Sequence, residues 1–360
     1  MGTVGCHVLL EEGSTRSPSS RDPNELRLFS KCRNERLRLP AFLHHYRKLG
    51  VRRFFIVDNG STDDSLPYLA AQSDVHVFRT QGSFREARGG TDWLNALLKA
   101  FGIGGWCVTV DMDELLWYPG SESAPLQQFT AYLDAQGKQA LFCMLLDMYP
   151  GGKLRDAVYV EGTDLIEAAP FFDPGPYERV PGQQCPDVLV YGGVRERVFY
   201  PEAHTPNLKR NLHVSLYHRV LPKLRKLSKV PFVHEHRPLF PPCLTKVPLV
   251  RWESDTEYLN VNHFVSPRKE ALESGVLLHF KLMQDFHARA GQEAARGQYF
   301  DGAVEYRRYA ETLRSDPEMT LRYEGSRRLE STQQLVELGL LRDTPQWRSA
   351  RTNQAAAVSL

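Results

Sequence analysis

Apolar and polar residues follow two alternating patterns along the first 150 positions of this 360-residue chain. Short apolar runs bounded by polar turns predict buried strands at residues 26–32, 54–57, 75–78, 106–110 and 140–146. Between them, apolar residues recur at helical spacing, which predicts helices over residues 40–49, 64–71, 91–101 and 126–133. Strands that alternate with helices favour an α/β fold of three layers around a mainly parallel sheet.

The pattern loosens beyond residue 150, where Pro and Gly recur up to about residue 186 and predict long loops. Strands are predicted again at residues 246–252, 258–265 and 276–282, followed by one or two helices over 284–313. We therefore expect five segments along the chain. They are a flexible leader (1–24), a regular α/β half (25–150), a loop-rich half (151–282), a C-terminal helical segment (283–345) and a frayed tail (346–360).

Composition narrows the class of protein. Hydrophobic residues make up 42% and charged residues 24% of the chain, as in ordinary globular proteins. Its 45 Lys and Arg against 43 Asp and Glu argue against a nucleic-acid-binding protein but permit an anionic small ligand. The six cysteines are far apart, so neither a zinc site nor a redox pair is expected. Without a signal pattern or an apolar run of about 18 residues, a cytoplasmic protein is expected.

The strongest candidate for chemistry is Asp111-Met112-Asp113-Glu114, which follows the predicted strand 106–110. Residues i and i+2 of a strand share a face, so Asp111 and Asp113 are expected to converge on one point. Two such carboxylates repel each other unless a cation lies between them, and hard oxygen ligands suit Mg²⁺ or Mn²⁺. The alternative is a pair of solvated acids in a turn.

Two other predicted strands also end in polar residues. The sequence KCRNE (31–35) closes the first strand, and DNGS (58–61) closes the second. Each alone is compatible with an ordinary turn or a helix cap. Because α/β sheets bind ligands at the carboxyl ends of their strands, we expect the three polar segments to form one site.

Taken together, Arg-Asn-Glu after the first strand, FFIVDNGSTDDS and WCVTVDMDE resemble the nucleotide-sugar half of family 2 type glycosyltransferases, which have the GT-A fold. The later segments GGVRERVF and LLHFKLMQDFHARA resemble a bacterial subgroup with an Asp-x-Asp-Glu strand end, and family 92 type enzymes share part of this pattern. The match is good over residues 26–118 and patchy over 151–244. It implies a GT-A-like domain in which residues 25–150 bind the nucleotide sugar and residues 151–282 bind the acceptor.

The resemblance implies roles in nucleotide-sugar binding. Asn34, Glu35, Asp58 and Asn59 would line the pocket for the base and the ribose. Many family 2 members carry a second Asp where this chain has Asn59, so the base that is recognised is left open. Two arginines ahead of the helix expected at 91–101 would neutralise phosphate or orient the sugar, for which the bidentate geometry of Arg is suited. They are Arg85 and Arg88.

The resemblance also implies a divalent metal site. Asp113 would hold Mn²⁺ or Mg²⁺ bridging the diphosphate, Asp111 would contact the ribose or the ion, and His279 would be a later ligand or diphosphate contact. Independently of the family, His279 and Lys281 share one face of the predicted strand 276–282. A polar pair of this kind is unusual for a core strand, so Lys281 is counted among the cofactor-binding residues.

The expected activity is transfer of a sugar from a nucleotide-diphosphate sugar to an acceptor hydroxyl, with inversion, in glycan or cell-surface polysaccharide synthesis. The metal would offset charge on the departing diphosphate, and Asp111 and Asp113 would be the catalytic residues. A carboxylate would act as general base on the acceptor. The candidates for this base are Asp147, Asp187 and Glu196.

Two other functions stay open. A HAD-like phosphohydrolase also ends a strand in Asp-x-Asp, but usually the first strand and with Thr or Val where this chain has Leu115. A non-catalytic sugar-nucleotide-binding protein would keep the pocket without turnover. A nucleotidyltransferase is disfavoured because residues 31–36 contain no Gly for a phosphate loop.

A basic stretch at residues 219–229 repeats Leu at three-residue spacing. It is typical of a solvated helix face, and it would also suit an anionic membrane surface. The expected acceptor is a glycan or a lipid-linked sugar. The expected location is the cytoplasm, with peripheral contact at the inner face of the membrane through residues 219–229 as an alternative.

Overall fold

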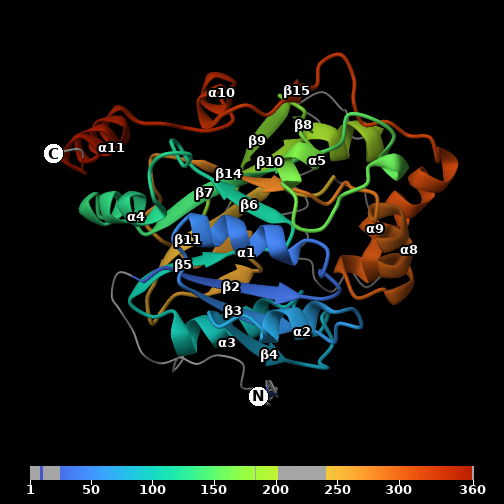
Figure 1. Cartoon of the computed structure of the whole chain (residues 1–360), viewed down its shortest axis with the longest axis horizontal. Helices are drawn as coiled ribbons and strands as arrows, with labels where there is room; N and C mark the ends of the chain where they lie inside the picture. Colours follow the sequence, from blue (N-terminus) through green and yellow to red (C-terminus); the bar gives the residue numbers. More distant parts are fainter. Residues whose placement is uncertain (1–8, 11–24, 183, 202–240, 359–360) are drawn as a thin grey trace.

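The computed structural model describes residues 9–10, 25–182, 184–201 and 241–358. Within these residues a nine-stranded sheet forms the centre of the molecule, in the order β1-β4-β3-β2-β5-β11-β7-β14-β6 (Figure 1). Its strands are β1 (Leu9–Leu10), β2 (Arg27–Cys32), β3 (Arg53–Asp58), β4 (Val75–Arg79), β5 (Gly105–Thr109), β6 (Glu114–Trp117), β7 (Ala140–Asp147), β11 (Thr245–Trp252) and β14 (Gly275–His279).

The sheet is mostly parallel, as predicted. Strands β4, β3, β2 and β5 pair in parallel, and so do β7 and β14. Strand β11 lies antiparallel between β5 and β7, and β6 and β1 are antiparallel edge strands. The predicted halves 25–150 and 151–282 therefore contribute strands to one common sheet.

Helices pack on both faces of the sheet (Figure 1). The longer helices are α1 (Leu39–Lys48), α2 (Ser65–Ala70), α3 (Thr91–Phe101), α4 (Leu126–Ala135), α8 (Phe286–Arg296), α9 (Phe300–Ser315), α10 (Thr332–Glu337) and α11 (Pro345–Val358). Between β7 and β11 lie η1 (Leu154–Asp156), α5 (Leu165–Ala168), β8 (Phe171–Phe172), β9 (Tyr177–Pro181), β10 (Val188–Gly192) and a π-helical turn, η2 (Arg195–Phe199). Three further short strands are β12 (Tyr258–Asn260), β13 (Phe264–Val265) and β15 (Arg327–Arg328).

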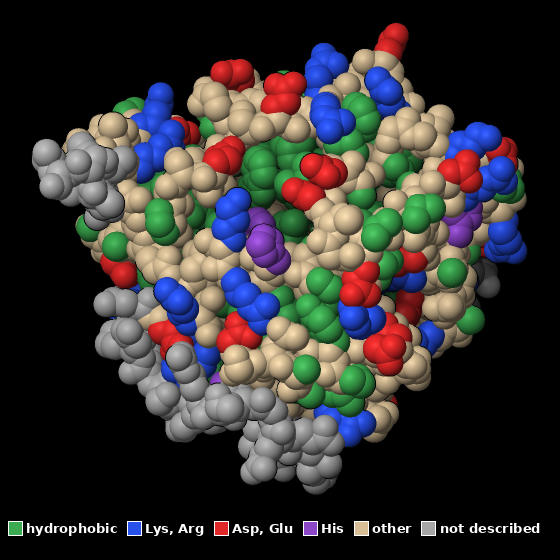
Figure 2. All heavy atoms as spheres, viewed as in Figure 1, with side chains coloured by type: hydrophobic (Ala, Val, Ile, Leu, Met, Phe, Trp, Pro, Cys, Tyr) green, Lys and Arg blue, Asp and Glu red, His purple; other side chains and the backbone are tan. Residues whose placement is uncertain are grey.

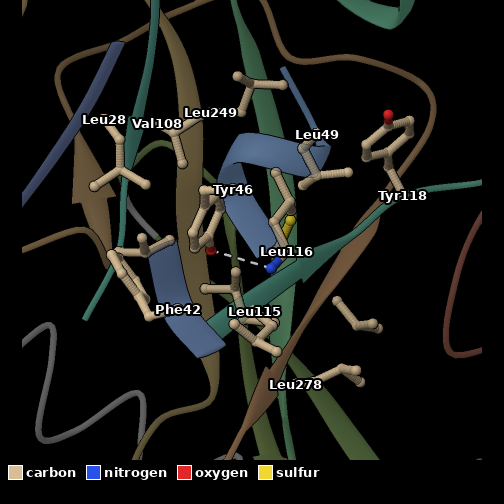
Figure 3. Packing of buried hydrophobic residues seen from close by; sticks show 14 of the residues in the cluster. Leu28, Phe42, Tyr46, Leu49, Val108, Leu115, Leu116, Tyr118, Leu249 and Leu278 are labelled. Atoms are coloured by element: carbon tan, nitrogen blue, oxygen red, sulfur yellow. Dashed lines mark hydrogen bonds between the residues drawn. The ribbon is translucent and has the colours of Figure 1, made fainter. Parts of the chain in front are cut away.

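Alternation along the parallel strands divides the apolar core between the two faces. Leu28 and Phe54 belong to the core shared with α1 and α4, whereas their neighbours Phe29 and Phe55 belong to the core shared with α3. Successive side chains of a strand point to opposite faces, so a continuous apolar run fills both cores. Figure 3 shows the first of these cores, in which α1 packs over the strands.

Tyr46 of α1 positions the strand that follows the acidic motif. Its buried hydroxyl donates to the Glu114 carbonyl at 2.9 Å and accepts from the Leu116 backbone N–H at 3.1 Å (Figure 3). Both groups belong to β6, which begins directly after Asp113. A residue of the first helix therefore helps to hold the acidic motif at the edge of the sheet.

Several boundaries differ from the sequence prediction. Strand β6 was not expected, because its four residues are too few to show a period. The strand expected at 258–265 is the pair β12 and β13, and the strand expected at 276–282 ends at His279, so Lys281 lies beyond it. Residues 9–10, placed in the flexible leader, pair with β4.

The C-terminal segment also differs from the prediction. Residues 345–358 form α11 rather than part of a frayed tail, and the Trp347 side chain is fully buried against α4. In Figure 1 this helix lies next to α4. An isolated Trp in a polar helix gives no helical apolar period, so the sequence pattern did not indicate the contact.

No helix in the described part of the chain is long and apolar enough to cross a lipid bilayer. Basic and acidic side chains are intermixed over the face seen in Figure 2, in keeping with the net charge of +2. The basic stretch 219–229 lies outside the described residues.

A buried ion cluster joins the starts of β2 and β3. The Glu25 carboxylate accepts from Arg53 Nε and Nη2, both at 2.6 Å, and from Arg27 Nε at 3.0 Å. Burial alone would raise the pKa of Glu25, but the two guanidinium groups outweigh it and lower that pKa. A carboxylate with a lowered folded-state pKa stabilises the fold above its unfolded pKa of about 4.3 and loses this contribution as pH falls.

We therefore expect Glu25→Gln to lower the free energy of unfolding at pH 7 by about 3 kcal/mol, because two buried cations lose the carboxylate that lies between them. The difference from the wild type should shrink as the pH falls below about 5, because the wild-type carboxyl becomes protonated. Urea unfolding at several pH values measures both effects, with exposed Glu86→Gln as control. A difference that stays constant over this pH range would contradict the prediction.

Candidate active site

A cavity of about 650 Å³ opens at the carboxyl ends of the parallel strands. It is bounded by the segment after β2, the turn between β5 and β6, the end of β14, and residues of α8 and α9. In Figure 1, α8 and α9 lie beside this edge of the sheet. The predicted strand-end segments 31–35 and 111–114 both contribute to it, as expected for a parallel sheet.

Basic side chains outnumber acidic ones among the described residues that line the cavity. The basic residues are Lys31, Arg33, Arg85, Arg88, Arg195, Lys246, Lys281, Arg289 and Arg296. The acidic residues are Glu35, Asp111, Asp113, Glu114, Glu293 and Glu305. The excess of cations favours an anionic ligand, while the acidic groups limit how much of that charge is free.

Asp113, His279 and Asp147 form a chain of ionisable groups at one wall. His279 Nδ1 lies 2.6 Å from Asp147 Oδ1, and His279 Nε2 lies 3.4 Å from Asp113 Oδ2. The sheet register explains the first contact, because His279 of β14 lies directly opposite Asp147 of β7. The Asp147 carboxylate orients the imidazole, so that Nε2 faces Asp113.

Asp147 is held in turn by Arg195. The guanidinium Nε donates to Asp147 Oδ2 at 2.7 Å, and both side chains are at most 5% exposed. Burial would raise the pKa of Asp147, but Arg195 and then His279 outweigh it and hold this pKa at about 2. Burial would lower the pKa of His279, but the two carboxylates outweigh it and raise that pKa.

Asp111 does not point at the same place as Asp113. Its Oδ1 accepts from Lys31 Nζ, and its Oδ2 lies 3.7 Å from Lys246 Nζ. Lys246 is buried in β11 and also donates to Glu114 Oε1 at 2.8 Å. Burial would raise the pKa of Asp111, but Lys31 and then Lys246 outweigh it and hold this pKa at about 2. The first carboxylate of the motif is therefore balanced by protein cations.

Gly90 makes room for the Lys31 side chain. Its φ is 82°, in the left-handed region, and an added Cβ would lie 2.7 Å from Lys31 Cδ. Any other residue here would strain the backbone and displace the lysine. The turn before α3 therefore helps to place a cation on Asp111.

These residues fit a divalent cation only in part. Asp113 Oδ2 and His279 Nε2 face each other, and a carboxylate and an imidazole backed by Asp147 are suitable ligands for Mn²⁺. Asp111 is turned toward the two lysines. No group of three or more His, Cys, Asp or Glu side chains is arranged to hold a metal in the described part of the chain. An ion bound here would take its other ligands from phosphate oxygens and water.

Helix α8 adds cations to the opposite wall. Arg289 donates to Glu35 through Nη2 at 2.6 Å and Nη1 at 3.3 Å, and Arg296 Nη2 donates to Asn59 Oδ1 at 3.0 Å. Residues 289, 293 and 296 are four and seven positions apart, so they lie on one face of the helix. Glu35 and Asn59 thus line the cavity as expected, but their polar atoms are engaged by α8.

Asn34 and Asp58 do not line the cavity. The exposed Asn34 Oδ1 accepts from the Thr62 backbone N–H at 2.7 Å, and the buried Asp58 Oδ2 accepts from the Ser61 N–H at 3.2 Å. Both side chains organise the loop before α2. They therefore act as residues of an ordinary turn, which was the alternative interpretation of these strand ends.

Arg85, Arg88 and Lys281 do line the cavity. Arg88 is exposed and pairs with Asp92 at 2.5 Å, and Arg85 is exposed at the rim. The Lys281 Nζ lies 4.5 Å from the centre of the Tyr306 ring, within cation–π range.

None of the three expected general bases faces the cavity. Asp147 is buried between Arg195 and His279. Asp187 is exposed in the turn before β10, and Glu196 is buried; neither lines the cavity.

The cavity also contains a neutral histidine and an aromatic wall. His263 Nδ1 lies 2.7 Å from the Thr245 carbonyl, which only accepts, so Nδ1 carries the proton and Nε2 is left as an acceptor. Burial and then Lys246 hold the pKa of His263 well below its usual value. The rings of Phe84, Tyr299 and Tyr306 follow one another at 5.2 and 4.6 Å between centres and offer a surface for a base or a sugar.

Sequence reasoning missed several residues of this site, above all Lys246, Arg289 and Glu305. A lysine inside the apolar strand 245–252 was a signal, because a buried charge requires a partner. The spacing of 289, 293 and 296 was another. Compared with models of known protein families and with curated proteins, the chain has no match.

Proposed function

We propose that this protein is a metal-dependent glycosyltransferase with a GT-A-like domain, which moves a sugar from a nucleotide-diphosphate sugar to an acceptor hydroxyl. The observation that carries the proposal is the pairing of Asp113 with His279 in a cation-rich cavity at the carboxyl edge of the sheet. Nucleotides bind at this edge in α/β folds, and the motifs 31–35, 58–61 and 111–114 resemble those of family 2 type enzymes.

Asp113 and His279 would hold Mn²⁺ or Mg²⁺, with Asp147 fixing the imidazole. When bound, the ion supplies Lewis-acid stabilisation of the charge that develops on the leaving diphosphate. His279 and then Arg289 outweigh burial and hold the pKa of Asp113 well below its usual value, and Arg289 would bind a phosphate oxygen. The aromatic wall of Phe84, Tyr299 and Tyr306 would stack against the base or the sugar of the donor.

The acceptor class follows from the same proposal. A glycan or a lipid-linked sugar would enter from the side of the loop-rich residues 151–201, which contribute Arg195 to the cavity. A phosphohydrolase or a non-catalytic binding protein would use the same cavity differently.

A thermal-shift titration with UDP, GDP, CDP and dTDP, each with and without Mn²⁺, tests the proposal. We expect one nucleotide to raise the melting temperature only when Mn²⁺ is present. A ligand at a hundredfold excess over its Kd stabilises the native state by about 2.7 kcal/mol, which a melting curve resolves readily. If none of the four nucleotides raises the melting temperature, the proposal is contradicted. If a nucleotide binds but no sugar nucleotide is turned over, the non-catalytic protein is favoured.

A further inference from the structure

Inverting transfer requires a carboxylate that faces the cavity and has an oxygen free to accept a proton. Most acidic residues of the cavity are already committed. Glu35 is bound through both oxygens by Arg289, and Glu114 is 1% exposed and bound by Lys246. Asp111 is balanced by two lysines, and Asp113 faces His279. The two that are left are Glu293 and Glu305.

Glu305 of α9 is anchored through one oxygen alone. Its Oε1 accepts from the Tyr309 hydroxyl and lies 3.3 Å from Lys281 Nζ and 3.8 Å from Arg195 Nη1. No described residue donates a hydrogen bond to Oε2. The side chain is 31% exposed and lines the cavity, so Oε2 is open to a ligand. Two hydrogen-bond donors, Tyr309 and Lys281, and the nearby Arg195 cation thus hold Oε1 while Oε2 stays available.

The position of Glu305 relative to the proposed metal pair also suits this role. Arg195, which lies beside Glu305, holds Asp147, and Asp147 holds His279. Glu305 therefore lies on the wall where the loop-rich half meets the cavity. Glu293, in contrast, pairs with Arg296, which binds Asn59 on the nucleotide side.

Building on the glycosyltransferase function proposed above, we propose that Glu305 is the general base of the transfer. The acceptor oxygen forms a bond to the anomeric carbon while the bond from that carbon to the diphosphate oxygen breaks. The acceptor proton passes to Glu305 Oε2, and the electron pair of the broken bond leaves with the nucleoside diphosphate. The bonds and charges balance without a further reactant.

The charged groups around Glu305 keep its carboxyl group ionised. Lys281 follows β14, Arg195 comes from η2, and Tyr306 and Tyr309 lie on α9 itself. Burial would raise the pKa of Glu305, but Lys281 and then Arg195 outweigh it and lower that pKa. The carboxylate is therefore ionised throughout the neutral range.

Release of nucleoside diphosphate from a panel of UDP-, GDP-, CDP- and dTDP-sugars tests this role without knowledge of the acceptor, because water also needs a base. We expect Glu305→Ala to lower release by about 10²–10⁴-fold while nucleotide binding in the thermal-shift assay changes little. Azide is an anionic nucleophile that has no proton to lose, so it needs no base. Sodium azide should therefore restore release in Glu305→Ala and yield a glycosyl azide of inverted configuration. Glu305→Gln should lower release to the same extent, although it changes the volume of the side chain less. Glu311→Gln, at an exposed position on the same helix, is the control.

Each other result overturns the assignment. Undiminished release in Glu305→Ala excludes Glu305 as base, and a comparable loss confined to Glu293→Gln transfers the role to that residue. A loss that azide does not restore, with nucleotide binding intact, makes Glu305 a structural anchor of α9. If the wild type neither binds a nucleoside diphosphate nor releases one, the proposed function itself fails, and the role of Glu305 fails with it.

Discussion

Under the glycosyltransferase function proposed above, Asp113→Asn is expected to reduce sugar transfer by at least about a thousandfold. The Asp113 Oδ2 atom lies 3.4 Å from His279 Nε2 in the cavity. A metal ion contributes several kcal/mol of transition-state stabilisation, and each loss of about 1.4 kcal/mol lowers the rate tenfold. The amide keeps the shape of the side chain, so cooperative unfolding should be retained.

Two measurements check this prediction. Release of nucleoside diphosphate reports the rate, and the thermal shift with nucleotide should lose its dependence on Mn²⁺ in the variant. Asp316→Asn, at an exposed carboxylate after α9, is the matched control and should behave as the wild type. Turnover of Asp113→Asn near the wild-type rate would remove the metal site from the proposal.

Trp347→Ala is expected to have the largest effect on stability. The ring is fully buried, with its centre 4.8 Å from that of Phe129 and 5.2 Å from that of Tyr132, and Nε1 donates to the Pro119 carbonyl at 2.7 Å. Replacing a buried Trp by Ala typically costs about 3–5 kcal/mol, and here a hydrogen bond is lost as well.

Urea unfolding of the full chain measures this cost, and exposed Gln346→Ala, one residue away, is the control. Trp347 packs on α4 and does not line the cavity, so nucleotide binding should be retained. An unchanged unfolding midpoint would mean that α11 opens separately from the cooperative unit.

Asp111 and Asp113 show what a pattern of polar residues at a strand end can predict and what it cannot. The spacing of the two residues predicted that their carboxylates would converge on one point, but they only line the same cavity and point to different partners. It did not indicate that Asp111 would meet Lys31 and Lys246. Lys246 comes from β11, which inserts antiparallel between β5 and β7, and no local pattern specifies such a pairing.

The search for a general base shows the same limit. Asp147, Asp187 and Glu196 were selected by their position after the acidic motif, and none of them faces the cavity. Glu305 lies on α9, far along the chain, and reaches the cavity only because α9 packs beside η2 and the end of β14.

The sequence by itself determined the helices and parallel strands from β2 to β7, the mostly parallel sheet and the edge of that sheet where polar residues gather. These features follow from periods of two and 3.6 residues and from turn chemistry, which act over short stretches of chain. Only the tertiary structure decided the insertion of β11, the burial of Trp347 and the set of charges around Asp111, Asp113 and Glu305. The reason is physical: each depends on contacts between distant residues, whose free energy is gained only once the chain has packed.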